Sequence, residues 1–498
     1  MSKPSTKPDR LTPSLLEPQS RGGEIADSGF SFQDRVILAH IPDWIGQEGF
    51  TAMVKEATGD FEAKFYVPNR GFEKDLVEVK DHTLSPNEFW KEIARFQQIE
   101  DGSPNTYRRF TLIGTGASKE LQPILNGLKR VQGSQDFYEE QDAVRSNSID
   151  EYICLIESND HTKQDALFLI KYVTVETDWS TVKSTGEAIF KDKLVKALQE
   201  YEDLPTRILN DIYNHLSTFI RNNINRPISR KELEINLQEK IPTNQRPAIR
   251  PIVVYTAITP NDNPSFPGLR FDWTQFSGGE IRTISPPEHW DCLLHDLQET
   301  RTWIENHRNT KRIRLEGNRR LPACFAFGSV LSAVRGYAIE MDCRGEAFTT
   351  DCHSTPDTPP YFLKHQLTQK EGNILVVSIS IARNIVAEVQ DNLDRLGLSD
   401  ESFLDIQGDL AITSPEQANL VVKNIKDSIV QNLQSTSCNA IHLFYAGPAH
   451  LALFLGHRLD ATAPVTCYGW SGGKYFRTCQ LFSQGNHNES NITSRQII

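Results

Sequence analysis

The sequence predicts an α/β protein built from more than one domain, and three observations support this. At 498 residues the chain is long for a single hydrophobic core, so two or three domains are expected. Segments with strand periodicity alternate with segments of helical periodicity, which is typical of a parallel or mixed sheet covered by helices. A proline-rich stretch at residues 241–251 separates the two halves and is the best candidate linker.

These patterns also set the expected domain boundaries. Residues 24–240 and 260–482 are expected to be the two folded parts, joined by a linker at residues 241–259. Residues 1–23 are rich in Ser, Pro and Lys and lack an apolar segment, so they are interpreted as a flexible leader rather than a secretory signal. The polar residues 483–498 are expected to form a flexible tail.

The first part is expected to follow the order α-β-β-β-α-β-α. Residues 68–71, Pro-Asn-Arg-Gly, have the composition of a hairpin turn between the second and third strands. Ser85 is an expected N-cap, with Glu88 at capping-box spacing. The elements are expected at residues 30–44, 50–56, 61–67, 75–80, 85–96, 109–113 and 118–131, followed by a strand at 166–175 and helices at 184–221 and 229–240.

The second part has its own alternation of strands and helices. Continuous apolar runs at residues 374–381, 441–445 and 464–468 predict strands buried on both faces. Helical spacing is expected at residues 290–307, 385–396, 418–433 and 449–459. The pattern therefore predicts a second α/β domain with a parallel or mixed sheet.

Composition and charge describe an ordinary folded protein, which we expect in the cytoplasm. No window approaches the roughly 18 apolar residues of a membrane helix, so no membrane association is expected. The net charge of −12 excludes a globally basic nucleic-acid coat protein, but it leaves room for a nuclease with a local DNA contact. The eight cysteines form no CxxC pair, so neither a zinc site nor a disulfide framework is expected.

The strongest candidates for a catalytic site are four charged residues near the expected hairpin, Glu56, Asp60, Glu78 and Lys80. Glu78 and Lys80 share one face of a strand because strand side chains alternate, and the hairpin brings Asp60 beside them. Asp60 and Glu78 are the expected metal ligands, and Glu56 is an additional candidate. Asp75 is a rival to Asp60, but it lies on the same strand as Glu78 and is less well placed across the hairpin.

Such a group suits the hydrolysis of a phosphodiester bond. Two carboxylates can hold Mg²⁺ (or Mn²⁺), a hard cation that prefers oxygen ligands. The metal polarises the phosphate and lowers the pKa of a bound water, while Lys80 can orient that water and stabilise developing negative charge. An ExK triplet alone more often marks a solvated strand face, so the prediction depends on Asp60 and on the order of the elements.

This arrangement resembles the PD-(D/E)xK restriction-endonuclease-like nucleases. Residues 29–33 and 78–82 are more specifically similar to the nuclease domain of bacterial CBASS antiphage effectors. In that family a glutamine often occupies the position of Glu78, and no proline precedes Asp60 here. The resemblance implies a restriction-endonuclease-like domain with a helical extension, in which Gln33 is either close to the active site or a surface or capping glutamine.

From about residue 260 the chain resembles the SAVED domain. The segments that carry this resemblance are residues 270–273, 276–279, 319–321, 325–328, 344–345, 350–353, 376–383 and 441–450, together with Trp290 and Trp303. The resemblance implies two fused CARF-like Rossmann units. Such a domain binds a cyclic oligonucleotide second messenger, with a trinucleotide preferred, that is made by a partner cyclic nucleotide synthase.

A ligand is expected at the carboxyl ends of the strands, where the strand order switches. Arg383 could pair with a phosphate, and Tyr445 or Trp470 could stack on a base. The residues expected to contact the ligand are Arg383, Tyr445, Gly447, Pro448, Phe327, Gly328, Arg320 and Trp470. Each also has an ordinary structural explanation as a core, turn or polar surface residue. The basic residues between 308 and 320 are either a phosphate or DNA contact or a solvated face.

The resemblance implies an antiviral effector. Ligand binding would drive self-association of the chains, and the nuclease would then cut double-stranded DNA. Two alternatives stay open: a restriction-type nuclease without a small-molecule signal, and a non-catalytic nucleotide sensor whose nuclease fold has decayed.

Overall fold

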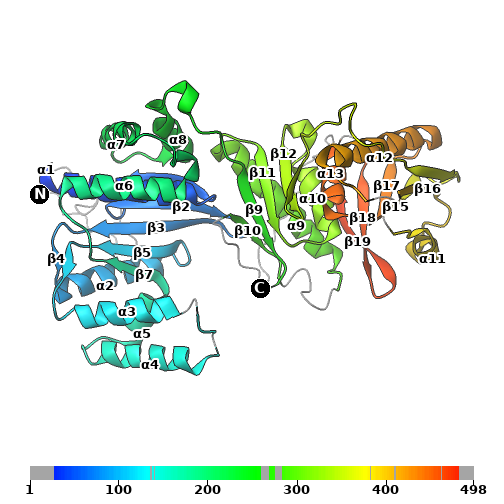
Figure 1. Ribbon diagram of the computed structural model, residues 1–498. Coiled ribbons are helices and arrows are strands. Elements are labelled where there is room, and N and C mark those ends of the chain that lie inside the picture. Colours follow the sequence, from blue (N-terminus) through cyan, green and yellow to red (C-terminus); the bar gives the residue numbers. More distant parts are fainter. Residues whose placement is uncertain are drawn as a thin grey trace, which may run out of the picture. The chain divides into compact units, whose positions relative to one another are not determined.

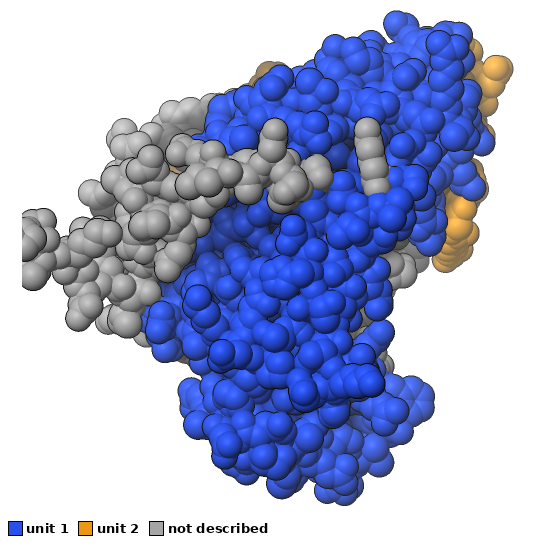
Figure 2. Space-filling model, turned by 90° about the vertical axis from the view of Figure 1, so that its left-hand side faces the viewer, with its two compact units in different colours: residues 1–248 blue, residues 249–498 orange. Residues whose placement is uncertain are grey.

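The structure is a computed structural model that describes residues 27–134, 137–139, 141–259, 268–274, 283–381, 383–408, 411–460 and 462–481 (Figure 1). The chain divides into two compact units, Met1–Ala248 and Ile249–Ile498 (Figure 2). This boundary falls inside the segment expected to be a linker. The expected leader and tail lie outside the described residues. Across the described ranges, no helix is both long enough and apolar enough to cross a membrane.

Unit 1 is built around a six-stranded sheet with the order β7-β5-β3-β2-β1-β8. Strands β1, β2 and β3 are joined as antiparallel neighbours, whereas β3, β5 and β7 run parallel. The expected order α-β-β-β-α-β-α is confirmed, with the two-residue strands β4 and β6 added to it. The elements are α1 (Asp27–Gly46), β1 (Phe50–Lys55), β2 (Phe61–Val67), β3 (Gly71–Val79), β4 (Thr83–Leu84), α2 (Pro86–Gly102), β5 (Tyr107–Ile113), β6 (Gly116–Ala117), α3 (Gln122–Ser134), α4 (Ala143–Glu157), α5 (Lys163–Tyr172), β7 (Val173–Glu176), α6 (Lys183–Ala197), α7 (Thr206–Arg221), β8 (Ile228–Ser229) and α8 (Arg230–Glu239).

Two predictions for the later part of this unit are wrong. Residues 166–175, expected to be a strand, form most of α5 and only then β7. Thr162 and Asp165 form a capping box in which each side chain accepts a hydrogen bond from the other residue's backbone N–H, and this starts a helix in an apolar segment. The helix expected across residues 184–221 is divided into α6 and α7, with a 3-10 turn at Gln199–Tyr201 between them. Pro205 is the N-cap residue of α7 and disfavours a helical conformation at the residue before it, which keeps α7 from starting earlier.

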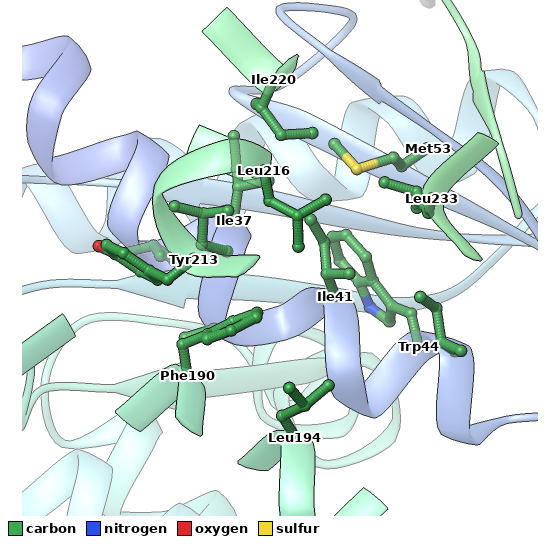
Figure 3. Packing of buried hydrophobic residues seen from close by; sticks show 14 of the residues in the cluster. Ile37, Ile41, Trp44, Met53, Phe190, Leu194, Tyr213, Leu216, Ile220 and Leu233 are labelled. Carbon is green, nitrogen blue, oxygen red and sulfur yellow. The ribbon is translucent and has the colours of Figure 1, made fainter. Parts of the chain in front are cut away.

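Helices cover both faces of the sheet of unit 1 (Figure 1). On one face, Ile37, Ile41 and Trp44 of α1 belong to a buried apolar cluster together with Phe190 of α6 and Leu216 of α7 (Figure 3). A second cluster on the other face joins the sheet to α2, α3, α4 and α5. The sheet therefore lies between two helical layers with separate cores.

Strand β3 has two chemically different faces as a result. Val77 and Val79 belong to the core under α1, whereas Leu76 belongs to the core under α2. By the same alternation, Asp75 lies on the α1 side and Glu78 on the α2 side.

Unit 2 contains two sheets, with orders β10-β9-β11-β12-β13 and β14-β16-β15-β17-β18-β19. Strands β9 to β13 of the first sheet and β15 to β19 of the second have the same arrangement. In each set the first strand lies between the second and the third, the first four strands run parallel, and the fifth is antiparallel. Strand β14 adds an antiparallel edge to the second half. The elements are β9 (Ile252–Ala257), β10 (Leu269–Asp272), α9 (Pro287–His307), β11 (Arg312–Gly317), α10 (Leu321–Val330), β12 (Ala338–Cys343), β13 (Glu346–Thr349), β14 (Lys364–Thr368), β15 (Ile374–Ile381), α11 (Val386–Leu396), β16 (Ser402–Gly408), α12 (Pro415–Thr436), β17 (Ala440–Ala446), α13 (Ala449–Arg458), β18 (Val465–Ser471) and β19 (Lys474–Leu481).

The equivalent helices α10 and α13 join the two halves at reciprocal glycines. A Cβ atom added to Gly328 in α10 would lie 2.1 Å from the carbonyl oxygen of Leu453 in α13. A Cβ atom added to Gly456 in α13 would lie 2.4 Å from the carbonyl oxygen of Phe325 in α10. Backbone contact at this distance is open only to glycine, so each helix carries the glycine that the other needs.

The expected linker at residues 241–259 is too long, because its second half is a strand. Residues 252–257 form β9, which pairs with β10 on one side and β11 on the other. Ile252 and Val254 are almost fully buried. An apolar run directly after a proline-rich stretch thus begins the second core rather than extending the linker.

Candidate functional site

Asp60 lies directly before β2, at the point where the β2–β3 hairpin places it beside the end of β3. Its Oδ2 accepts a hydrogen bond of 2.6 Å from the backbone N–H of Val79. Its Oδ1 accepts one of 2.7 Å from the side-chain amide of Gln33 in α1. The structure therefore brings Asp60 to the Glu78–Lys80 segment, as the hairpin predicted, and it places Gln33 in the site.

Glu78 and Lys80 project together toward α2. The Lys80 Nζ lies 2.9 Å from Glu78 Oε1 and 3.1 Å from Glu92 Oε1. Arg95 donates to Glu78 Oε2 at 2.6 Å, to Glu92 Oε2 at 2.7 Å and to the backbone carbonyl of Thr58 at 3.0 Å. Two acids and two cations thus form a closed ion-pair network at the end of β3.

The sequence analysis did not identify Glu92 and Arg95. Both come from α2, which follows the hairpin, and turn chemistry and strand alternation do not show which side of this helix faces the end of β3. Glu92 is buried beside the apolar residues Phe89, Ile93 and Phe96 of the same helix. A charged residue next to the apolar face of an amphipathic helix was therefore the sequence feature that could have indicated Glu92 as a site residue.

Burial alone would lower the pKa of Lys80, but the carboxylates of Glu78 and Glu92 outweigh burial and raise this pKa above its usual value. Lys80 is therefore a cation at neutral pH. It can stabilise negative charge on a phosphate, and it is poorly suited to act as a general base.

Glu56 follows β1 and completes the acidic group. Its side chain is buried, its Oε1 has no hydrogen-bond partner among the described residues, and its φ of 57° is in the left-handed region. Burial, opposed by the charge of Lys55 and reinforced by that of Glu78, raises the pKa of Glu56. Burial and then the charge of Glu78 also raise the pKa of Asp60 well above its usual range.

These carboxylates fit a cation bound through few protein ligands. No group of three or more His, Cys, Asp or Glu side chains has the arrangement of a complete metal cage among the described residues. Mg²⁺ is often held by one or two carboxylates and several waters, so a complete cage is not required. The orphaned Glu56 oxygen and the mutual repulsion of Asp60, Glu78 and Glu56 are features that a bound cation would relieve.

Asp75, the rival metal ligand, lies outside this group. Its two carboxylate oxygens accept hydrogen bonds of 2.7 and 2.9 Å from Arg108, which also donates to Gln47. Since Asp75 is on the α1 side of β3 and Glu78 on the α2 side, the strand itself separates them.

Replacement of Asp60 by asparagine is expected to raise the melting temperature of the metal-free protein at pH 7. A group whose folded-state pKa is raised stabilises the fold fully below its unfolded pKa, about 3.9 for Asp, and this stability is lost as pH rises through the folded pKa. The uncharged amide does not lose it. Scanning calorimetry in EDTA at pH 7 and at pH 4 measures the gain, which is expected to shrink at pH 4. A melting temperature that falls at pH 7 would contradict the electrostatic account of Asp60.

In unit 2, several of the residues expected to bind a ligand follow the carboxyl ends of parallel strands. Arg383 follows β15, Gly447 and Pro448 follow β17, and Trp470 is near the end of β18. The chain leaves β15 toward β16 on one side and leaves β17 toward β18 on the other, so β15 and β17 flank a topological switch point. Arg383 is exposed and its Nη2 lies 2.5 Å from Glu388 Oε1.

Tyr445 is buried in β17 near this switch point. Its hydroxyl donates a hydrogen bond of 2.7 Å to the carbonyl oxygen of Pro448, and its ring packs edge-on against Phe325. In this structure its contacts fix the turn at Gly447 and Pro448. Trp470, by contrast, is 38% exposed and packs against Tyr475.

The structure places Phe327 and Gly328 in tightly packed surroundings. Phe327 is 1% exposed and packs against Phe271 and Trp273 in the core of the first half. Gly328 lies against the backbone of α13. In this structure Phe327 packs α10 against β10, and Gly328 permits the close crossing of α10 and α13. An apolar helix with glycine suits such packing as well as it suits a pocket. Arg320 is the N-cap residue of α10, after the carboxyl end of β11.

The basic residues of the 308–320 stretch are mostly held by neighbours. Arg312 pairs with Asp351 at 3.1 Å and Arg314 with Glu340 at 2.5 Å. The half-buried Arg319 donates to the carbonyl oxygens of Glu316 and Gly317. These pairings favour a structural explanation over a continuous DNA-binding surface.

Comparison with known proteins gives consistent results for both units. Residues 296–481 match the model of the SAVED family, described as the SMODS-associated and fused to various effectors sensor domain. CD-NTase-associated protein 4 from an Acinetobacter species is 26% identical over 481 residues, covering 95% of this chain and 100% of that protein. The protein of the same name from Moraxella osloensis is also 26% identical, over 479 residues.

Solved structures show the same fold. The Acinetobacter baumannii Cap4 SAVED/CARF-domain containing receptor with the cyclic trinucleotide 3'3'3'-cAAA has a TM-score of 0.80 at 22% identity, covering 92% of this chain and 100% of that one. The Moraxella osloensis Cap4 receptor has a TM-score of 0.75, also at 22% identity, with coverages of 92% and 100%. Residues 296–481 therefore match the SAVED family, and over nearly its whole length the chain is similar to CD-NTase-associated protein 4 and has the fold of the Cap4 SAVED/CARF-domain containing receptors.

Proposed function

We propose that this chain is an antiviral effector endonuclease. In this proposal a cyclic oligonucleotide, made by a partner synthase, binds to unit 2 and activates unit 1 to cut double-stranded DNA in a metal-dependent reaction. The observation that carries the proposal is the convergence of Asp60, Glu78 and Lys80 at one end of a sheet, in a chain whose other unit contains a SAVED domain. A restriction-endonuclease-like fold of unit 1 is part of the proposal.

The residues of unit 1 have separable roles in this reaction. Asp60 and Glu78 would hold Mg²⁺ (or Mn²⁺), with Glu56 as an additional ligand, and the bound cation would polarise the phosphate and activate a water. Gln33 orients Asp60 through the 2.7 Å hydrogen bond. Lys80, kept protonated by its acidic neighbours, stabilises charge that develops on the scissile phosphate.

The ligand of unit 2 is proposed to be a cyclic trinucleotide, because Cap4 receptors of the same fold were solved with cyclic trinucleotides. Its phosphates would lie at the β15–β17 switch point, where Arg383 is exposed and the backbone amides at the start of α13 are oriented toward the strand ends. Trp470 offers an exposed ring for a base.

Activation is proposed to work through self-association of ligand-bound chains. A nuclease that would damage its own cell while idle needs a ligand that favours the active state, and a ligand can shift that equilibrium only by binding the active state more tightly.

The test is incubation of the purified chain with plasmid DNA and Mg²⁺, alone and with a panel of cyclic di- and trinucleotides. Light scattering on the same samples measures assembly. Cleavage and larger particles are expected only with the activating nucleotide. Cleavage that needs no nucleotide would instead support a restriction-type nuclease. Nucleotide binding without cleavage under any condition would support a non-catalytic sensor.

A further inference from the structure

The loop at residues 56–59 carries Glu56 into the candidate metal site at an energetic cost. Its backbone is tightly folded: the N–H of Glu56 donates to the carbonyl oxygen of Asp60 at 2.7 Å, and the N–H of Ala57 donates to that of Gly59 at 3.1 Å. A left-handed φ in a residue other than glycine and a buried carboxylate oxygen without a partner are both unfavourable. Such a conformation persists only where its surroundings hold it.

Two consecutive residues of α1 hold the two ends of this loop. At one end, Asp34 Oδ1 accepts a hydrogen bond of 2.6 Å from Nζ of Lys55, the last residue of β1. At the other end, Gln33 donates to Asp60. The side chains of Asp34 and Lys55 are each only 1% exposed, so this ion pair is inside the fold and water does not compete for its charged groups.

The second oxygen of Asp34 binds a different element. Arg221, at the end of α7, donates to Asp34 Oδ2 at 2.7 Å, and its own side chain is 56% exposed. Asp34 is therefore held between a buried lysine next to Glu56 and an exposed arginine away from the loop. The two contacts can be removed separately.

We propose that Asp34 and Lys55 are positioning residues that fix the carboxylate of Glu56 for cation binding. This inference rests on the proposed function. Lys55 anchors the end of β1 to α1, and this forces the next residue into the left-handed turn that aims its side chain at Asp60 and Glu78. Without the anchor, Glu56 relaxes out of the site, and the cation loses one ligand.

The experiment measures Mn²⁺ binding to the full chain by isothermal titration calorimetry without DNA. Lys55→Met is expected to weaken binding by about 10- to 100-fold, the usual effect of losing a residue that orients a metal ligand. Glu56→Gln is expected to weaken it by a similar factor. Because Lys55 acts through Glu56, the double variant is expected to bind as weakly as Glu56→Gln alone, whereas independent roles would multiply the two losses.

Two controls separate positioning from stability. Arg108→Gln breaks the Asp75–Arg108 pair on the same side of the sheet, and Arg221→Gln breaks the exposed contact of Asp34. Both are expected to leave Mn²⁺ binding within about twofold of wild type, although the first lowers the melting temperature. If Lys55→Met does not fold, Asp34→Asn keeps the volume and an acceptor for Lys55 while removing the charge, and it is expected to weaken binding in the same direction.

The outcomes are distinguishable. Wild-type Mn²⁺ affinity in a folded Lys55→Met protein, or losses that multiply in the double variant, would overturn the positioning role alone. A wild-type chain that binds no Mn²⁺ and cuts no DNA with any nucleotide would contradict the proposed function, and this role of Lys55 with it.

Discussion

Replacement of Lys80 by alanine is expected to reduce nucleotide-activated DNA cleavage by about 10²- to 10³-fold, the usual loss when one preorganised charge-stabilising group is removed. Lys80 Nζ is 2.9 Å from Glu78, which lies beside Asp60. The charge of Lys80 is therefore fixed where a phosphate would lie if it bound to a cation held by these two carboxylates. The measurement is the initial rate of plasmid cleavage at saturating Mg²⁺ and nucleotide.

The same replacement is expected to leave the fold intact. Arg95 still pairs with both Glu78 and Glu92 after Lys80 is removed, so neither carboxylate is left without a cation. Lys171→Ala, at an exposed lysine of α5, is the matched control and should cut at the wild-type rate. Binding of the cyclic nucleotide should be unchanged in both variants. A Lys80→Ala protein that cuts as fast as wild type would show that the catalytic assignment is wrong.

Replacement of Gly328 by alanine is expected to lower the free energy of unfolding of unit 2 by about 3 kcal/mol, at the upper end of the usual cost of overpacking. The added Cβ would lie 2.1 Å from Leu453 O and 2.5 Å from His457 N. These are backbone atoms of α13, so they cannot move away as a flexible side chain would. For a unit of this size the loss corresponds to a fall in melting temperature of roughly 6–12 °C.

Gly133→Ala is the matched control for this prediction. Gly133 lies in α3, and a Cβ atom added there has no neighbour within 4 Å in the part of the chain that the structure describes. Since alanine is the better helix former, this change is expected to stabilise unit 1 by up to about 1 kcal/mol. Calorimetry of the two variants compares them directly. A Gly328→Ala protein as stable as wild type would mean that α10 and α13 are not packed backbone to backbone.

The central part of the candidate site could be predicted from the sequence because its determinants are local. Alternation along β3 places Glu78 and Lys80 on one face, and the turn at residues 68–71 sets the hairpin that returns Asp60 to them. Their hydrogen bonds and ion pairs match that expectation. Their roles in catalysis stay predictions.

The partners from α1 and α2 could not be predicted in the same way. Glu92, Arg95 and Asp34 reach the site only after α1 and α2 pack on opposite faces of the sheet. Helical periodicity shows which face of a helix is apolar, but it does not show which strand end that face will cover. The ion-pair network, and the contacts by which α1 holds the loop at residues 56–59, are therefore tertiary features.

The same distinction explains the outcome for unit 2. The three predicted strands at residues 374–381, 441–445 and 464–468 and the helices after the first two are confirmed, because continuous apolar runs and helical spacing are properties of short segments. The buried strands β9 and β16 were not predicted. Phe327 and Gly328, expected at a ligand, are packed against β10 and against α13 respectively, since one apolar segment containing glycine suits a packed core as well as a pocket.

By itself the sequence determined the two α/β parts, the order of elements around the hairpin, and the meeting of Asp60, Glu78 and Lys80. Only the tertiary structure decided that Asp75 pairs with Arg108, that Glu92 and Arg95 pair with Glu78 and Lys80, and that α10 and α13 pack through Gly328 and Gly456. The physical reason is range: periodicity and turn chemistry act over a few residues, whereas charge pairing and backbone contact depend on which distant surfaces the core brings together.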